Sequence, residues 1–231
     1  INNPDPLQDV RLNEQSLSVS VKNLPSGQER MAVRLMRNLD VFYYKRMKFF
    51  LHGDGSMPAL IPYGAASKAQ AFIRFGLDSA NYYEVRRPII QGWRDIDIEV
   101  AKLTALKEKR SQEAATLRVP EDIITRFIDT AEQFDPGFSI PIETQYVIKG
   151  NPILTRIQFI GFGIANPTSG SFPEDLSTTM WVNELRLIEP ESSVDWAGIG
   201  SAELKLADLG TVNATYNQTN PNFHRLEERF G

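Results

Sequence analysis

A stretch of alternating residues near the C-terminal end constrains the fold of this chain most. Residues 180–188 read Met-Trp-Val-Asn-Glu-Leu-Arg-Leu-Ile and are followed by Glu189 and Pro190. Every second side chain of a strand points to the same side, and the pattern is typical of a strand with one packed face. We expect the packed face to hold Trp181, Asn183, Leu185 and Leu187. Pro190 cannot donate to a sheet, so the strand is predicted to end there.

The same period of two recurs through most of the preceding chain and predicts a β domain. Strands are expected at residues 16–21, 30–36, 43–52, 70–77, 82–87, 94–100, 145–149 and 154–161. Residues 102–112 and 120–133 instead have apolar side chains at helical spacing, and both are predicted as helices. The expected fold is mainly β: a two-sheet sandwich or jelly roll, galactose-binding-like in its last strand, with one or two helical insertions.

Changes in composition and in the pattern of apolar residues divide the chain into three parts. Residues 1–12 are polar with two prolines and are predicted to be an extended lead-in to a sandwich domain over residues 13–190. Residues 191–231 are predicted to be a hairpin and tail, because 200–207 and 211–216 alternate around a short turn. Small residues, a tyrosine and period-two patterning suit the start of a transmembrane β-hairpin, and the residues alone suit an ordinary hairpin equally well.

Six segments, in the same order along the chain, resemble the SprA family, very large outer-membrane proteins of the type IX secretion and gliding system of Bacteroidetes. The segments are Asn13–Ser18, Tyr44–His52, Phe72–Gly76 with Asn81–Glu84, Lys149–Pro152, Trp181–Leu187 and Ala207–Val212. The resemblance marks ten residues as a structural signature: Tyr44, Lys45, Arg46, Gly150, Asn151, Pro152, Trp181, Asn183, Glu184 and Arg186.

The resemblance implies a role for the chain. SprA proteins are far longer, so the chain would be an internal fragment, and residues 191–231 would begin barrel strands of the whole protein. The resemblance implies a non-catalytic globular domain of the outer-membrane translocon, which shapes the pore or docks partners in protein export and gliding motility. Its partners would be other translocon subunits and secreted cargo, and it would be water-exposed on the periplasmic or cell-surface side.

Composition and missing motifs argue against several other classes of function. The net charge is −4, from 25 basic and 29 acidic residues, so the chain lacks the excess of basic residues that is typical of nucleic-acid-binding proteins. The chain has no cysteine for a disulfide or a thiolate metal site. The histidines, His52 and His224, stand in no nucleophile motif. We therefore expect no enzyme and no cofactor.

Two alternatives to a purely structural role stay open. Tyr82, Tyr83 and Trp93, together with Trp181, could form a stacking platform for sugars, which would make the chain a carbohydrate-binding module of a cell-surface protein. Asp54, between two glycines, could hold a structural calcium ion, as jelly-roll loops do. The acidic residues of 95–99, by contrast, are expected to form a solvated strand face.

Overall fold

The computed structural model describes residues 15–54, 69–134, 141–168, 175–190, 197–206 and 210–219. The chain divides into two compact units, residues 1–190 and residues 191–231. In the first unit, ten strands form two antiparallel sheets with a shared apolar core, and a single α-helix is present among its described residues. The predicted class, a mainly β sandwich with a helical insertion, is confirmed.

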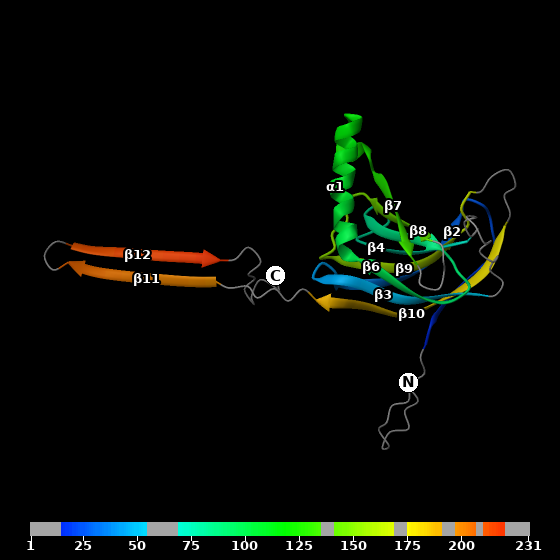
Figure 1. The fold of residues 1–231 in the computed structure, drawn as a ribbon, viewed down its shortest axis with the longest axis horizontal. Coiled ribbons are helices and arrows are strands. Elements are labelled where there is room, and N and C mark those ends of the chain that lie inside the picture. Colours follow the sequence, from blue (N-terminus) through cyan, green and yellow to red (C-terminus); the bar gives the residue numbers. More distant parts are fainter. Residues whose placement is uncertain are drawn as a thin grey trace, which may run out of the picture. The chain divides into compact units, whose positions relative to one another are not determined.

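The two sheets of the first unit differ in width (Figure 1). One has four strands in the order β1-β10-β3-β6, and the other has six in the order β2-β9-β4-β5-β8-β7. The strands are β1 (Leu17–Leu24), β2 (Glu29–Leu39), β3 (Tyr44–Gly53), β4 (Gln70–Gly76), β5 (Tyr82–Pro88), β6 (Gly92–Glu99), β7 (Arg126–Phe134), β8 (Pro141–Lys149), β9 (Ile157–Ala165) and β10 (Leu176–Pro190).

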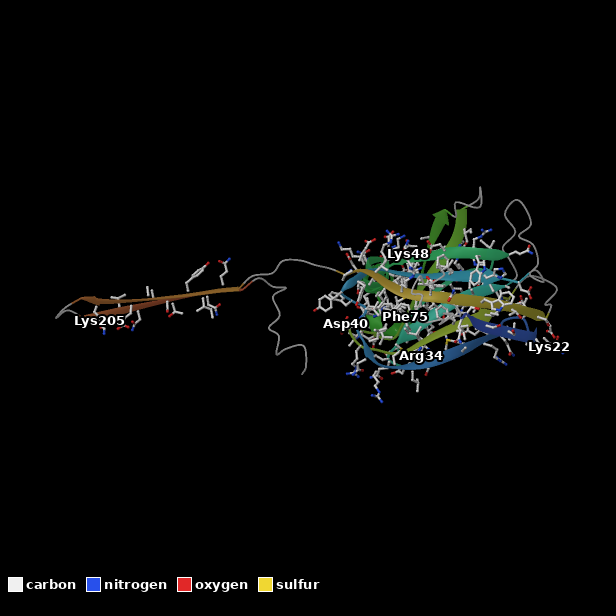
Figure 2. The ribbon with its side chains drawn as sticks, turned by 90° about the horizontal axis from the view of Figure 1, so that it is seen from below. Lys22, Arg34, Asp40, Lys48, Phe75 and Lys205 are labelled. Atoms are coloured by element: carbon white, nitrogen blue, oxygen red, sulfur yellow. The ribbon has the colours of Figure 1, made fainter. Side chains whose placement is uncertain are left out.

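The core lies between the sheets and is built from the inward residue of each alternating pair. Met47, Phe49 and Leu51 of β3 are all buried, as their spacing predicts. Ile73 and Phe75 of β4 meet them from the other sheet, and Figure 2 labels Phe75 behind the four-stranded sheet. Each such side chain contributes about 1.5–3 kcal/mol by leaving water, so this layer holds the two sheets together.

Helix α1 (Val100–Leu117) covers the part of the wide sheet that the narrow sheet leaves bare. It begins directly after β6, packs on β8 and β7, and rises alongside β7 in Figure 1. Its buried residues, which include Leu103, Leu106 and Ala114, recur at intervals of three and four and so share one face. The helix predicted over residues 102–112 is confirmed and is longer. No described helix combines the length and the apolar character needed to cross a membrane.

The second predicted helix, over residues 120–133, is wrong. A short 3₁₀ turn, η1 (Glu121–Ile123), is followed by strand β7, whose residues pair with β8 from Arg126 opposite Lys149 to Phe134 opposite Pro141. Short apolar runs fit both periods. The long pairing with β8 decides the conformation here, because it satisfies backbone groups that the edge of β8 would otherwise expose.

Strand β10 contains a bulge that reverses which residues face the core. Asn183 is opposite Phe50 of β3 and Arg186 is opposite Lys48, so β10 has one more residue than β3 between these pairs. Glu184, at the bulge, has a positive φ of 53°. A bulge shifts the alternation by one. The prediction that Trp181 and Asn183 share a packed face with Leu185 and Leu187 is therefore wrong, and Trp181 lies on the outer face.

The second unit contains one antiparallel hairpin of β11 (Ala197–Leu206) and β12 (Gly210–Thr219). Its register places Ala202 opposite Ala214 and Gly200 opposite Tyr216, on one face. Glu203 and Lys205 lie on the other face. Ile199, Val212 and Tyr216 are each more than half exposed, so the hairpin has large apolar side chains on its surface.

Candidate functional site

Three aromatic side chains form a row across the outer face of the four-stranded sheet. Strand register aligns Trp181 of β10, His52 of β3 and Trp93 of β6. The His52 ring meets each indole edge to face, with ring centroids 4.9 Å apart in both pairs. Trp93 is 50% exposed, and Nδ1 of His52 is buried with no hydrogen-bond partner among the described residues. This aromatic row offers an apolar, ring-lined surface with an unused nitrogen.

The two tyrosines predicted to join Trp93 in a sugar platform lie elsewhere. Tyr82 and Tyr83 are adjacent on β5, so they point to opposite faces of the six-stranded sheet, and both are buried. Tyr83 packs in the core near Phe75, where burial raises the pKa of its hydroxyl to about 12. Trp93 belongs to the other sheet, so the proposed platform of Tyr82, Tyr83 and Trp93 is not formed. Of the residues named for it, Trp93 and Trp181 are brought together.

Next to the aromatic row, the same face carries a ladder of opposite charges. Asp97 of β6 accepts two hydrogen bonds from Arg46, at 2.9 and 2.6 Å. It also forms an ion pair with Lys48 at 3.0 Å. Burial alone would raise the pKa of Asp97, but the hydrogen bonds from Arg46 and Lys48 outweigh it and the pKa is lowered. Asp95 and Glu99 are exposed, as predicted for a solvated face, and each forms a long ion pair of 3.8 Å with a lysine. The Asp97 side chain is only 17% exposed and is held by shorter ion pairs.

A denser charge cluster lies on the outer face of the six-stranded sheet. Glu84 of β5 is fully buried and accepts hydrogen bonds from Arg74, with Nε at 2.7 Å, and from Arg86 at 2.9 Å. Glu29 of β2 binds the same two guanidinium groups, each at 2.6 Å. Phe72 lies between them, with both guanidinium carbons 4.9 Å from its ring centroid. These four charges neutralise each other and tie β2, β4 and β5 together.

The predicted signature residues Gly150, Asn151 and Pro152 lie in the loop between β8 and β9, which contacts helix α1 and the β4–β5 turn. Gly150 has a φ of +62°, which glycine adopts readily. Its carbonyl accepts a hydrogen bond from the buried Arg110 of α1 at 2.6 Å, and the Asn151 amide donates to Oδ1 of Asn81 at 2.9 Å. These residues thereby connect helix α1 and the β4–β5 hairpin to the loop before β9, which indicates a structural role.

The other signature residues lie at the start of β3 and around the bulge of β10. Tyr44 opens β3 with a backbone hydrogen bond to Val41 of 3.1 Å, and Lys45 is exposed. Within β10, Glu184 and Arg186 form an ion pair of 2.5 Å across the bulge, and the Arg186 guanidinium carbon is 5.8 Å from the Phe50 ring centroid. Arg46 belongs to the charge ladder and Asn183 is half-buried, so this group also shapes the outer face.

The calcium prediction concerns the loop after β3. The Asp54 backbone amide donates to the Thr179 carbonyl at 3.2 Å, which joins the loop to β10. Residues 55 and 56, the rest of the predicted loop, lie outside the described residues, as does His224. Within the described ranges, no group of three or more histidine, aspartate or glutamate side chains is placed to hold a metal ion.

An open apolar groove, which alternation in the sequence does not predict, runs along the edge of the sandwich where β1, β2 and β10 meet. We call it the edge groove; it encloses about 600 Å³. Its lining residues are Leu17, Ala32, Val33, Arg34, Met36, Leu39, Met47, Ile160, Phe162, Leu185 and Leu187. Figure 2 looks onto the four-stranded sheet and labels Arg34 on β2 along this edge. The groove exists because the β10 bulge turns Leu185 and Leu187 inward, a shift that alternation alone does not reveal.

Low pH is expected to destabilise the sandwich through Glu29. Burial by itself would raise the pKa of Glu29, but hydrogen bonds from Arg74 and Arg86 outweigh it and lower the pKa from the ordinary value of 4.5. The stabilisation is therefore complete above the ordinary pKa and is lost as pH falls through the lowered value. Melting temperature should drop as pH falls below about 5. Glu29→Gln should flatten this profile, and Glu113→Gln, on an exposed part of α1, should not; equal profiles for all three proteins would contradict the assignment.

Comparison with known proteins gives a family match. A family model named SprA_N, described as motility related/secretion protein, matches residues 2–230, nearly the whole chain. No curated protein and no solved structure matches the chain.

Proposed function

The chain belongs to the SprA_N family of motility-related and secretion proteins, and we propose that it acts there as a non-catalytic docking domain of the outer-membrane type IX translocon. In this role its surfaces shape the export pore or bind translocon subunits and cargo, and it supports both protein export and gliding. The match over residues 2–230 is the observation that carries the proposal. The domain would face water on one side of the outer membrane of a Bacteroidetes cell.

The use of charge in the fold supports docking over catalysis. The most buried carboxylate, Glu84, is bound by two arginines, and Asp97 and Glu121 are also held by basic side chains. Catalytic acids and bases need a position from which they can reach a substrate. These groups instead join strands and the helix to one another, which leaves apolar surfaces such as the edge groove as the features available to a partner.

The exposed hairpin of the second unit supports membership of a larger assembly. All the side chains described in β12 are exposed, including Val212 and Tyr216, and the outer edges of both strands have no strand partner among the described residues. Such edges tend to pair with further strands. We propose that β11 and β12 pair with strands of the whole protein.

Deletion of residues 15–190 from the whole protein in a gliding bacterium tests the proposal. We expect the shortened protein to reach the outer membrane, while cargo secretion into the medium and gliding are both lost. Immunoblots of outer-membrane fractions control for expression. Normal secretion and gliding with the shortened protein at wild-type level would contradict the proposal.

A carbohydrate-binding module remains the second candidate, and the aromatic row is the observation that favours it. Trp93 is half exposed next to His52 and Trp181. Sugar rings stack on the exposed faces of aromatic side chains, and this surface offers such a face. Calorimetry with common polysaccharides decides between the two. Binding that disappears in Trp93→Ala but persists in Tyr82→Phe would move the sugar function to first place.

A further inference from the structure

Strand β1 closes one half of the open edge of the sandwich, and the edge groove is the other half. β1 pairs with β10 only as far as Leu17, which lies opposite Val182. β10 continues from there to Pro190, and on the side of β1 this part of β10 has no strand partner among the described residues. Leu17 lines the groove together with Leu185 and Leu187 of the unpaired part. The groove therefore continues the slot that β1 fills.

The residues of β1 show which side chains fill this slot. Val19 and Val21 point into the sandwich and are buried, whereas Ser18 and Ser20 beside them are exposed. β1 pairs with β10, and it meets β2 and β9 of the wide sheet by packing across the sandwich. Aliphatic side chains at every second position, with small polar residues between them, therefore suit the space between β10 and β2.

The walls of the edge groove have the same apolar character as the slot under β1. Leu185 and Leu187 line it from β10, and Ala32 lines it from β2. Arg34 faces the groove too, since it lies opposite Ile160 of the core. Arg34 is exposed, so its aliphatic stem can cover apolar surface while its charged group stays in water. Leu185 is 37% exposed, which leaves apolar area for an added segment to bury.

The residues that precede β1 in the chain have the wrong pattern for this groove. β1 directs its odd-numbered residues inward, and the same alternation continued toward the N-terminus would direct Gln15, Asn13 and Arg11 at the groove. Polar side chains buried without partners against the leucines of β10 would cost free energy. Leu12 and Val10 would face the other side. A different segment is needed to fill the groove.

We propose that the edge groove binds an extended segment of a partner protein in which valine or leucine alternates with small polar residues, and that this segment pairs with β10 beyond Val182 in line with β1. Its apolar side chains pack between β10 and β2, as those of β1 do. Its backbone hydrogen bonds satisfy the unpaired edge of β10 and provide affinity. The inference rests on the proposed docking function and names the surface and the chemistry of the partner.

The test uses the whole chain and a fluorescent peptide of about eight residues, a usual strand length, in which valine alternates with serine. Fluorescence anisotropy should show saturable binding. Leu185→Asp should weaken binding about tenfold or more, because the bound peptide would bury the new carboxylate against its apolar face. Leu35→Asp is the matched control. Leu35 is also exposed, but it lies opposite Phe159, on the face of β2 that points away from the groove.

A second peptide provides a control that leaves the protein unchanged. It has the same composition, but its valines and serines stand in pairs, so that neither face of the strand is apolar throughout. It should bind about tenfold more weakly or less, since half of the apolar contacts are lost. Equal binding of the two peptides, equal binding by Leu185→Asp, or a chain dimer that excludes the peptide would overturn the proposal. The deletion experiment is independent: loss of secretion without peptide binding refutes this inference alone, and intact secretion refutes the proposed function.

Discussion

Replacing Glu84 by alanine is expected to destabilise the sandwich by about 3–5 kcal/mol, since removing one member of a buried ion pair leaves the other charges without compensation. Glu84 is fully buried, and the side chains of Arg74 and Arg86 are only 14% and 13% exposed. In the variant, both guanidinium groups would depend on Glu29 alone. Urea unfolding followed by tryptophan fluorescence measures the change in the free energy of unfolding.

Glu29→Ala is the matched control for this prediction. Glu29 binds the same two arginines, but its side chain is 36% exposed, so water can replace much of what it provides. We expect a clearly smaller loss of stability than for Glu84→Ala. A double-mutant cycle of Glu84→Ala and Arg74→Met should show strong coupling. Equal, small effects of the two glutamate substitutions would mean that the cluster is not a main source of stability.

Part of this cluster was within reach of the sequence. Residues 70–77 and 82–87 are predicted as hairpin partners, and the observed register places Arg74 opposite Glu84. Opposite charges across a hairpin indicate an ion pair. The contribution of Glu29 could not be predicted, because β2 reaches β4 only through β9, a strand more than a hundred residues away in the chain. Local alternation determines which face a residue takes, and it does not determine which strands become neighbours.

The two errors in the fold have a common physical origin in tertiary pairing. Residues 126–134 carry apolar side chains that fit a helix, but β8 offers them a long ladder of backbone hydrogen bonds. In β10 the alternation was correct on each side of Glu184, and one inserted residue reversed it between them. Both outcomes depend on a neighbouring strand. Helix α1 pairs with no strand, and its central part, residues 102–112, was predicted.

Surface features also depend on which strands become neighbours, which local sequence patterns do not determine. Residue type alone marks Trp93 and Trp181 as possible stacking residues, but the sequence does not show that His52 of the predicted strand 43–52 lies between them. The edge groove depends on the β10 bulge and on the place of β2 at the end of its sheet, so no local pattern marks it. Arg34 and Arg37 of β2 can be read from the sequence, but only the assembled sheets show that neither has an acidic partner among the described residues.

Gly150→Ala is the second substitution expected to have a large effect, about 2–5 kcal/mol, because it combines backbone strain with a steric clash. At a φ of +62° a side chain costs about 1–2 kcal/mol. A Cβ atom there would also overlap the carbonyl oxygen of Ala80 and lie 2.5 Å from Oδ1 of Asn81. Relief of such overpacking costs about 1–3 kcal/mol more, and it would displace the Asn81 side chain that binds the Asn151 amide.

Gly92→Ala separates the two contributions. Gly92 has a similar positive φ of +84°, but an added Cβ would meet nothing within 4 Å, so only the backbone term remains. We therefore expect Gly92→Ala to lose about 1–2 kcal/mol and Gly150→Ala to lose clearly more in the same urea titration. The difference between the two losses in the free energy of unfolding measures the steric cost of packing a side chain at position 150 against the β4–β5 hairpin. If both variants unfold at the same urea concentration, the surroundings of Gly150 adapt to the added methyl group, and packing does not explain why a glycine stands at this position.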